Sequence, residues 1–337
     1  MSRQKDEVLG PVYQENFVQK KTTRRGFIHA AGFAASGMIA ATHPLSGTSP
    51  EPQTQPSSRT SMGTRFRTLL QGPELVQCIG APDILTARLA ELNGFQCIFI
   101  GGSTGASNGH GLPDNGLVST VELIEYASRI AGNIDIPALA DADDAGGTPL
   151  DVYRYAKAFE RAGVGGVMYE DRIRLERLKG NTQVSPTQDV VNRIHAAKDA
   201  SPDLLVVLRS ESISAKLSME ETLARGVAYA QAGVDILFFA GMKIEDFPRA
   251  ADTVKIPLYG SFDVPLARAR EARIKLNVHT STMRDIAMGA VNNALMELKS
   301  TGALTNASKN ALPSSIQAKL TRTQELSELS RKYNFVR

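Results

Sequence analysis

Acidic side chains stand at the ends of two short apolar segments of the chain. The segment 138–143 reads Ala-Leu-Ala-Asp-Ala-Asp, so Asp141 and Asp143 are two residues apart and would share one face of a strand. The segment 166–170 ends in Glu170. Carboxylates that converge repel each other unless a cation neutralises them or their pKa values rise, and oxygen ligands of this kind suit Mg²⁺. We therefore predict a Mg²⁺ site, with Mn²⁺ as an alternative ion, at these three acids; the competing interpretation is that they cap the following helices.

A basic residue and a glycine-rich segment follow two further apolar runs. Arg209 ends the run 204–209, and its guanidinium could bind a carboxylate or phosphate in bidentate fashion or pair with a neighbouring acid. The run 97–101 leads into Gly-Gly-Ser-Thr-Gly, whose backbone amides could hold an anion. We expect the loop 101–105 to hold an anionic group and Arg209 to be a candidate for substrate binding and catalysis.

Two more polar residues are candidates for catalysis. Asp114 lies in Gly-Leu-Pro-Asp-Asn-Gly, where it is either a turn residue or a polar group placed over the substrate. Ser261 follows the apolar run 257–260, and either its hydroxyl or water could return a proton to a product. The two cysteines, Cys78 and Cys97, fit neither a disulfide framework nor a zinc pattern, so we expect buried thiols.

Eight short apolar runs alternate with amphipathic stretches after residue 73. The predicted strands are 75–80, 97–101, 138–143, 166–170, 204–209, 235–239, 257–260 and 275–278. The predicted helices are 82–93, 119–131, 149–162, 187–199, 218–232, 264–272 and 282–299, with a weaker one at 243–253. Strands that are apolar along their whole length are typical of parallel sheets covered on both faces.

This pattern predicts an α/β protein with a (β/α)8 TIM-type barrel, in which reacting groups stand at the carboxyl ends of the strands. A doubly wound open sheet is the alternative, but no Gly-x-Gly-x-x-Gly follows the first strand. The barrel would occupy residues 68–300. One further helix, at 313–333 within a C-terminal extension 301–337, exceeds what the barrel needs, so we expect it to cover a neighbouring subunit in a homo-oligomer.

The charge of the chain is concentrated near its beginning. Residues 1–60 carry seven basic and four acidic side chains, which accounts for the whole net charge of +3 and leaves the rest neutral. A neutral body offers no electrostatic basis for binding nucleic acid. The sequence contains no run of about 20 apolar residues, so we expect no integral membrane segment in the mature form.

Residues 1–47 have the layout of an export signal. Arg24 and Arg25 precede Gly-Phe-Ile, a weakly apolar stretch follows from 26 to 41, and a Pro/Ser/Thr-rich linker over 48–67 completes the pattern. The arginine pair resembles the twin-arginine signal of bacteria. That resemblance implies folding in the cytoplasm, passage through the twin-arginine export machinery, and a periplasmic or extracellular location. A chance arginine pair on an amphipathic helix is the alternative.

Several motifs in order resemble the isocitrate lyase / phosphoenolpyruvate mutase superfamily over roughly residues 68–300. They are Gly80-Ala81-Pro82-Asp83, Gly101-Gly102-Ser103, Leu112-Pro113-Asp114, Ala140-Asp141-Ala142-Asp143, Glu160-Arg161-Ala162-Gly163-Val164 and Glu170-Asp171. The resemblance implies a barrel that swaps a C-terminal helix between subunits of a homotetramer or homodimer. It also implies Mg²⁺ on Asp141, Asp143 and Glu170, a substrate carboxylate on residues 102–104, a distal acid group on Arg209, and Asp114 in a gating loop.

The chain departs from this family's pattern after strands 3, 6 and 7, and most clearly in the segment that carries the catalytic cysteine of its lyases. Their Lys-Arg-Cys-Gly-His motif is replaced by Arg177-Leu178-Lys179-Gly180-Asn181. In this respect the chain is nearer to the oxaloacetate decarboxylase-like and phosphonate (carboxyvinyl-carboxyphosphonate phosphorylmutase-like) branches.

Three functions are consistent with these residues. The first is a Mg²⁺-dependent C–C lyase, of decarboxylase or retro-aldol type, acting on a small 2-oxo or 2-hydroxy carboxylic acid through a metal-stabilised enolate. The second is a mutase or hydrolase of a phosphonate P–C bond. The third is a non-catalytic exported protein that binds oxo-acids.

Overall fold

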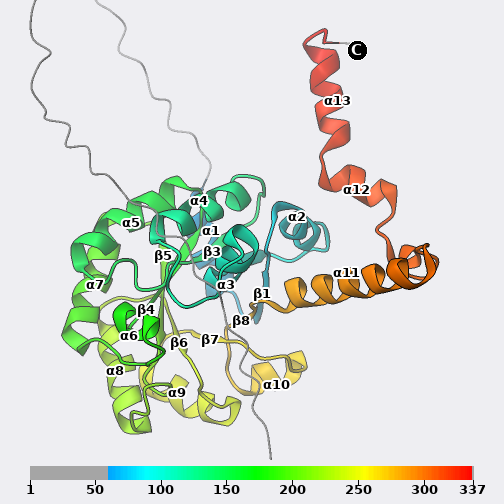
Figure 1. Cartoon of the computed structure of the whole chain (residues 1–337). Coiled ribbons are helices and arrows are strands. Elements are labelled where there is room, and N and C mark those ends of the chain that lie inside the picture. Colours follow the sequence, from blue (N-terminus) through cyan, green and yellow to red (C-terminus); the bar gives the residue numbers. More distant parts are fainter. Residues whose placement is uncertain (1–59, 336–337) are drawn as a thin grey trace, which may run out of the picture. The chain divides into compact units, whose positions relative to one another are not determined.

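Eight parallel strands close into a barrel in the computed structural model, which describes residues 60–335 (Figure 1). The strands are β1 (Val76–Gly80), β2 (Cys97–Ile100), β3 (Ala138–Asp141), β4 (Gly166–Glu170), β5 (Leu205–Ser210), β6 (Ile236–Phe239), β7 (Leu258–Gly260) and β8 (Leu276–His279). The strands pair in sequence order, and β8 closes on β1. The predicted (β/α)8 barrel is confirmed, and the open doubly wound sheet is wrong. The predicted signal, residues 1–47, lies outside the described residues.

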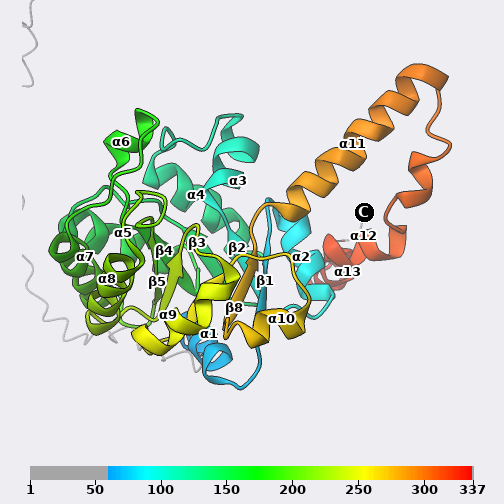
Figure 2. The same cartoon turned by 90° about the horizontal axis from the view of Figure 1, so that it is seen from below.

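Helices connect successive strands of the barrel, as predicted (Figures 1 and 2). They are α2 (Ile84–Leu92), α3 (Gly102–Thr104), α4 (Thr120–Ala131), α5 (Pro149–Arg161), α6 (Arg174–Leu178), α7 (Thr187–Ala200), α8 (Met219–Gln231), α9 (Phe247–Val254) and α10 (Leu266–Glu271). The short helices α3 and α6 were not expected from the sequence. The predicted weak helix at 243–253 is a 3₁₀ turn, Ile244–Asp246, followed by α9.

Two apolar layers hold the barrel together. One fills the interior, where alternate residues of the strands meet, and includes Leu139, Met168 and Val207. The other lies between the strands and the helices and includes Val167 and Phe159. Because side chains alternate across a strand, residues that point inward recur at every second position, and this period decides which polar residues reach the barrel mouth.

The predicted linker 48–67 is wrong over its last residues. Residues Met62–Gln71 form helix α1, which begins at Ser61, where the hydroxyl accepts the amide of Thr64 at 3.1 Å. Phe66 of this helix is fully buried and belongs to the interior layer of the barrel. Helix α1 contacts β4 and β5, and Gly63 lies against backbone carbonyls just before those strands. The helix therefore closes the amino-terminal end of the barrel.

Both predicted buried thiols are confirmed. Cys78 and Cys97 are fully buried, reduced, and paired in register across β1 and β2. Burial raises the pKa of the Cys78 thiol well above its usual value. Neither cysteine faces the carboxyl ends of the strands, so both serve packing in the barrel interior. No helix in the described part of the chain is long and apolar enough to cross a bilayer.

The C-terminal extension consists of two short helices and not of one. Helix α11 (Thr282–Thr301) ends at Gly302, and α12 (Ser314–Leu320) and α13 (Thr323–Lys332) follow. The predicted single helix 313–333 is wrong because Arg322 adopts a left-handed conformation with φ 52°. Figure 2 shows α11 projecting from the barrel and the chain returning toward α2. Arg88 of α2 donates to the Leu320 carbonyl at 2.7 Å, which fixes this return.

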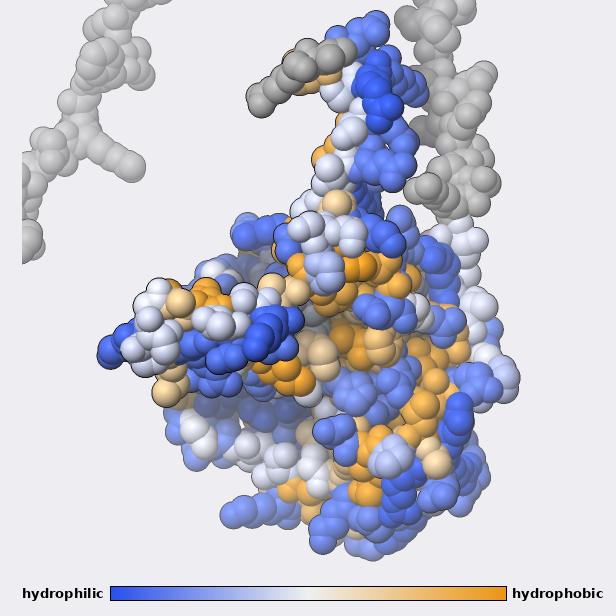
Figure 3. Space-filling view, turned by 90° about the vertical axis from the view of Figure 1, so that its right-hand side faces the viewer, coloured by the Kyte–Doolittle hydropathy of each residue, from blue (hydrophilic) through white to orange (hydrophobic). Residues whose placement is uncertain are grey.

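Helix α11 carries apolar side chains that no other part of the described chain covers. None of its 20 residues is buried. Its large apolar residues, between 43% and 63% exposed, are Ile286, Met288, Val291, Leu295, Met296 and Leu298. Figure 3, which views the side from which α11 and α13 project, shows hydrophobic surface exposed on this face. We propose that a second copy of the chain covers α11, which agrees with the expected homodimer or homotetramer.

Charge placed on α11 should dissociate the oligomer. Replacing Val291 and Leu295, which lie one turn apart on one face of α11, together with Asp should lower the mass measured by sedimentation velocity to that of one chain, because both carboxylates would be buried against the partner. Asn293→Asp, an exposed change on the same helix, is the control and should leave the mass unchanged. A wild-type protein that sediments as a monomer at micromolar concentration would contradict the proposal.

Candidate active site

The alternation of β3, β4 and β5 places three charged residues at the mouth of the barrel. The inward residues near the middle of these strands are Leu139, Met168 and Val207. Two positions further along come Asp141, Glu170 and Arg209. Glu170 pairs in register with Arg209, and Asp141 with Met168. Two of the three predicted metal ligands and the predicted substrate arginine thus stand on neighbouring strands at one rim.

Asp143 reaches the same rim through a turn of the backbone. It follows β3 with φ 49°, a left-handed conformation that Asp and Asn tolerate better than most residues. Its amide donates to Asp141 Oδ1 at 3.1 Å, and its carbonyl accepts the Glu170 amide at 2.9 Å. The three predicted ligands are therefore linked by backbone hydrogen bonds.

These acids do not cap helices. Helix α5 is capped by Thr148, whose hydroxyl accepts the Asp151 amide at 3.2 Å, and α6 has no side-chain cap. The acid with a local turn role is Asp144, which accepts the Gly146 amide at 3.1 Å. The alternative interpretation of Asp141, Asp143 and Glu170 as caps is therefore wrong.

Arg177 of α6 lies among the acids and was not among the predicted site residues. Its Nη1 donates to Asp143 Oδ1 at 2.6 Å and lies 3.4 Å from Glu170 Oε1. Its Nη2 donates to Asp114 Oδ1 at 2.5 Å. The side chain is only 8% exposed. The recurrence of arginine at 172, 174 and 177, directly after the acid-bearing strand, is the one sequence signal that could have found it.

A second cluster of charges surrounds Arg209. Its Nη2 pairs with Glu211, and its Nε lies 3.9 Å from Glu170 Oε2. Arg172 Nη2 contacts the same Glu211 oxygen at 3.0 Å. The alternative prediction for Arg209, an ion pair with a barrel acid, is thus realised, while 27% of its side chain remains exposed at the rim. Glu211, almost fully buried, was not among the predicted site residues.

The electrostatics of the rim are dominated by the cost of burying negative charge. Burial and, to a smaller extent, the neighbouring Asp143 carboxylate raise the pKa of Asp141 to about 6, although Arg209 opposes the rise. Burial also raises the pKa of Glu170 to about 7, although Arg209 and Arg177 oppose the rise. Burial would raise the pKa of Glu211 as well, but Arg209 and Arg172 hold it below its ordinary value. Asp141 and Glu170 are therefore the acids with the greatest need of a further cation.

The glycine-rich segment after β2 is helical and packs directly against the acids. Residues 102–104 form the single turn α3, and a π-helical turn follows over Gly105–Gly109. The Gly102 amide donates to Asp141 Oδ2 at 3.2 Å, and a Cβ at Gly102 would lie 3.2 Å from that oxygen. The Thr104 hydroxyl donates to the Gly101 carbonyl, and Ser103 accepts from Ser107. Of the three predicted binding residues, Gly102 is the one that the structure joins to the acids.

The structure joins Asp114 to the site but not Ser261. Asp114 is exposed in the loop before α4 and reaches the acids through Arg177. Ser261 is exposed after β7, and its hydroxyl donates to the Val278 carbonyl at 3.0 Å. Within residues 60–335, no hydrogen bond or ion pair connects Ser261 with the acids.

Asp171 fixes the strand ends beneath the site. It is fully buried and accepts the Glu211 amide at 2.8 Å, the Ser210 hydroxyl at 3.1 Å and the Tyr229 hydroxyl at 3.0 Å. Arg225 Nη2 lies 3.4 Å away from the same carboxylate. These bonds join the end of β4 to the end of β5 and to α8, so the positions of Glu170 and Glu211 are set by a rigid network.

The donors at the rim fit a divalent ion by type and charge. Carboxylate oxygens are the ligands that Mg²⁺ and Mn²⁺ prefer, and the raised pKa values show a demand for positive charge. As they stand, no three His, Cys, Asp or Glu side chains between residues 60 and 335 are spaced to hold one ion. Arg177 Nη1 contacts both Asp143 and Glu170.

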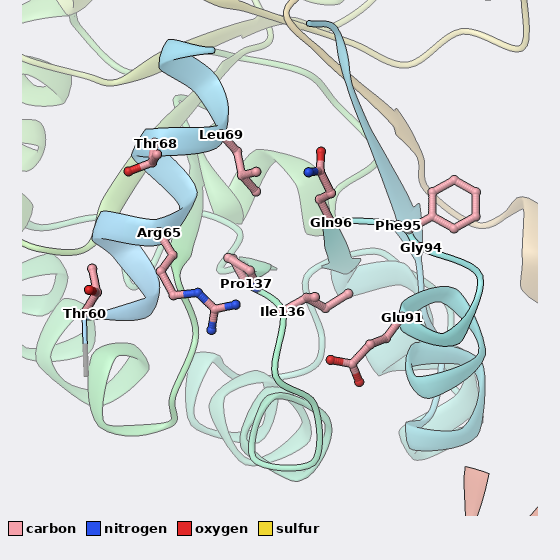
Figure 4. Close-up of a pocket in the computed structure, with 10 residues that line it drawn as sticks. All are labelled: Thr60, Arg65, Thr68, Leu69, Glu91, Gly94, Phe95, Gln96, Ile136 and Pro137. Atoms are coloured by element: carbon pink, nitrogen blue, oxygen red, sulfur yellow. The ribbon is translucent and has the colours of Figure 1, made fainter. Parts of the chain in front are cut away.

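A cavity lies at the opposite end of the barrel. Its volume is about 600 Å³, and Figure 4 shows Arg65 and Thr68 of α1 on one side and Gln96 and Ile136 on the other. Gln96 and Ile136 come just before β2 and β3, at the amino ends of the strands. Barrel enzymes place their chemistry at the carboxyl ends, so we assign the site to the acids and not to this cavity.

The family described as phosphoenolpyruvate phosphomutase matches residues 66–299. A 2-methylisocitrate lyase of Shewanella oneidensis is 31% identical over 203 residues, covering 59% of this chain and 69% of that enzyme. An oxaloacetate decarboxylase of Pseudomonas putida is 31% identical over 195 residues, covering 57% and 68% of the two chains.

Solved structures agree on the fold. An oxaloacetate acetylhydrolase superposes with a TM-score of 0.74 at 22% identity, covering 81% of this chain and 97% of that one. The closed barrel, the acids at its rim and the family match over residues 66–299 lead to one conclusion: this chain is a member of the phosphoenolpyruvate phosphomutase family, within the isocitrate lyase / phosphoenolpyruvate mutase superfamily.

Proposed function

We propose that this protein is a Mg²⁺-dependent carbon–carbon lyase, of decarboxylase or retro-aldol type, that acts on a small 2-oxo or 2-hydroxy carboxylic acid. The observation that carries the proposal is the meeting of Asp141, Glu170 and Arg209 at the inward positions of three neighbouring strand ends. Relatives named 2-methylisocitrate lyase and oxaloacetate decarboxylase support this reaction class.

Asp141, Asp143 and Glu170 would hold the divalent ion, directly or through water. When bound, the ion would draw electron density from the substrate oxygens and stabilise the negative charge that develops as the bond breaks. Mn²⁺ has the same ligand preference and could replace Mg²⁺.

The remaining residues bind and orient the substrate. Arg209, partly exposed at the rim and held by Glu211, presents a guanidinium that can pair with a substrate carboxylate. The turn at Gly102–Thr104 brings backbone amides beside the acids with no side chain at Gly102 to block the approach. Because the Ser261 hydroxyl already donates to a strand carbonyl, we assign proton return to water.

A phosphonate mutase or hydrolase is the second candidate function. Arg172 and Arg209 share one oxygen of Glu211, so two guanidinium groups lie close together at the rim. Clustered arginines suit the three oxygens of a phosphonate group, and the matching family is described as a phosphomutase. The third candidate, an oxo-acid binder without turnover, is an outcome of the first test below.

A substrate screen should separate these functions. With Mg²⁺, we expect the purified protein to release product from oxaloacetate, 2-methylisocitrate or 2,3-dimethylmalate, and EDTA should lower the rate by at least about 100-fold because the charge that develops is no longer stabilised. Turnover of phosphonopyruvate alone would favour the second candidate, and binding without turnover the third. Activity that is unchanged by EDTA would refute the metal site.

Replacing one rim aspartate with the isosteric asparagine should weaken the binding of the divalent ion and leave the fold intact. Asn suits position 143 because it tolerates the left-handed backbone there. We expect the Mn²⁺ affinity of Asp141→Asn and of Asp143→Asn, measured by calorimetry, to be at least about tenfold weaker than that of the wild type, since an amide replaces a carboxylate ligand. Asp144→Asn, the neighbouring turn residue, is the matched control. Unaltered Mn²⁺ affinity in both site variants would show that the ligands are misassigned.

We also propose that residues 1–47 direct export by the twin-arginine pathway to a periplasmic or extracellular location. The support is the pair Arg24-Arg25 before a weakly apolar stretch. Replacing both arginines with Lys keeps the charge and should leave unprocessed precursor in the cytoplasm, as measured by cell fractionation and blotting. Arg3→Lys is the control. Normal export of the double variant would mean that the arginine pair is not a signal.

A further inference from the structure

One guanidinium group connects three separate parts of the barrel rim. Arg177 contacts Asp143 after β3, Glu170 at the end of β4, and Asp114 in the loop of residues 110–118. That loop, here called the Asp114 loop, packs on the same side chain, since a Cβ at Gly116 would lie 3.6 Å from Arg177 Cδ. The contacts bring together a rigid strand end and two segments outside the barrel.

Arg177 contacts oxygens of two of the three proposed metal ligands. Asp143 Oδ1 and Glu170 Oε1 are oxygens of predicted metal ligands, and both are within 3.4 Å of Arg177 Nη1. A guanidinium and a divalent ion at this spacing from the same oxygens would repel each other strongly in a partly buried site. The two cations are therefore alternative occupants of one position.

The segment that carries Arg177 is attached to the barrel mainly at its base. At the base, Arg172 and Val184 form an isolated antiparallel β-bridge, and the Ile173 amide donates to the Gln183 carbonyl at 2.9 Å. The residues between these paired segments, 173–183, project as a flap. Within α6, at the tip of this flap, Arg177 is the one buried residue.

The apolar side chains of α6 face solvent. Leu175 and Leu178 are 60% and 45% exposed, so little apolar burial holds the flap in place. A segment with few buried apolar contacts opens at low free-energy cost. Its position therefore depends on the ion pairs of Arg177 and on a second arginine, Arg174, which donates to the Val118 carbonyl at 2.9 Å.

We propose that Arg177 is a latch, which neutralises the rim acids and ties the flap to the Asp114 loop until a divalent ion binds and displaces it. The inference rests on the metal site proposed above and deepens it, since it makes ion binding and flap opening one coupled event. Displacement would uncover the rim to substrate and leave Arg177 free on a movable segment.

Mn²⁺ binding tests the competition directly. Calorimetric titration of the full-length protein with MnCl₂ should give an affinity in Arg177→Gln about tenfold tighter than in the wild type, an ordinary size for coupling between two binding events. Arg177→Lys keeps the charge and should stay near the wild-type value. Lys179→Gln is the matched control, because it removes one positive charge from the same flap, is 54% exposed and pairs with Glu176 of its own helix, and it should change the affinity by less than about twofold.

Hydrogen exchange tests the opening without any variant. In the wild type, added Mn²⁺ should speed amide exchange in peptides covering residues 110–118 and 173–183 and leave the β4 and β5 peptides unchanged. An Arg177→Gln affinity equal to or weaker than that of the wild type would overturn the latch, and so would flap exchange that is unaltered or slowed by Mn²⁺. Absence of Mn²⁺ binding in the wild type and in Arg177→Gln alike would overturn the metal site itself, and the latch with it.

Discussion

The crowding of negative charge at one rim of the barrel is the constraint on which the arrangement of this site depends. Parallel strands bring their carboxyl ends to the same edge, and the two-residue period of β3 and β4 turns Asp141 and Glu170 inward there. Water is largely excluded, so the carboxylates must either bind protons or have cations beside them. Removing the partner of a buried charge costs about 3–5 kcal/mol, a large part of the stability of a typical domain, so a positive group is needed at all times.

The arginines that supply this positive charge differ in how firmly they are placed. Arg209 lies near the carboxyl end of β5. Hydrogen bonds of the Asp171 carboxylate hold this strand end against β4 and α8. Arg177 belongs to a short helix with a single buried residue, its own. One cation is thus built into the framework, and the other can leave it. The contrast between a rigid rim and a loosely held segment is common among enzymes that bind and release small ligands.

The fold could be predicted from the sequence because strands covered on both faces must be apolar along their whole length. The polar residues that end those runs, Asp141, Glu170 and Arg209, were recognisable because they break the pattern. Arg177 was not, since it lies on a five-residue helix that is too short to show a period. Helix α1 was missed for a related reason: its sequence, Met-Gly-Thr-Arg-Phe-Arg-Thr-Leu-Leu-Gln, is mostly polar, and the burial of Phe66 arises from long-range packing.

Helix α1, which closes the amino-terminal end of the barrel and forms its floor, limits how many residues can be removed from the start of the chain. Phe66 fills that floor from α1, and loss of a buried Phe costs about 3–5 kcal/mol. A proteolytic cut downstream of this residue would leave a ring-sized hole among strands that cannot move together to fill it. A cut upstream of Met62 would leave the floor sealed. The packing of Phe66 therefore sets the last position at which the chain can be cut without loss of stability, whichever protease makes the cut.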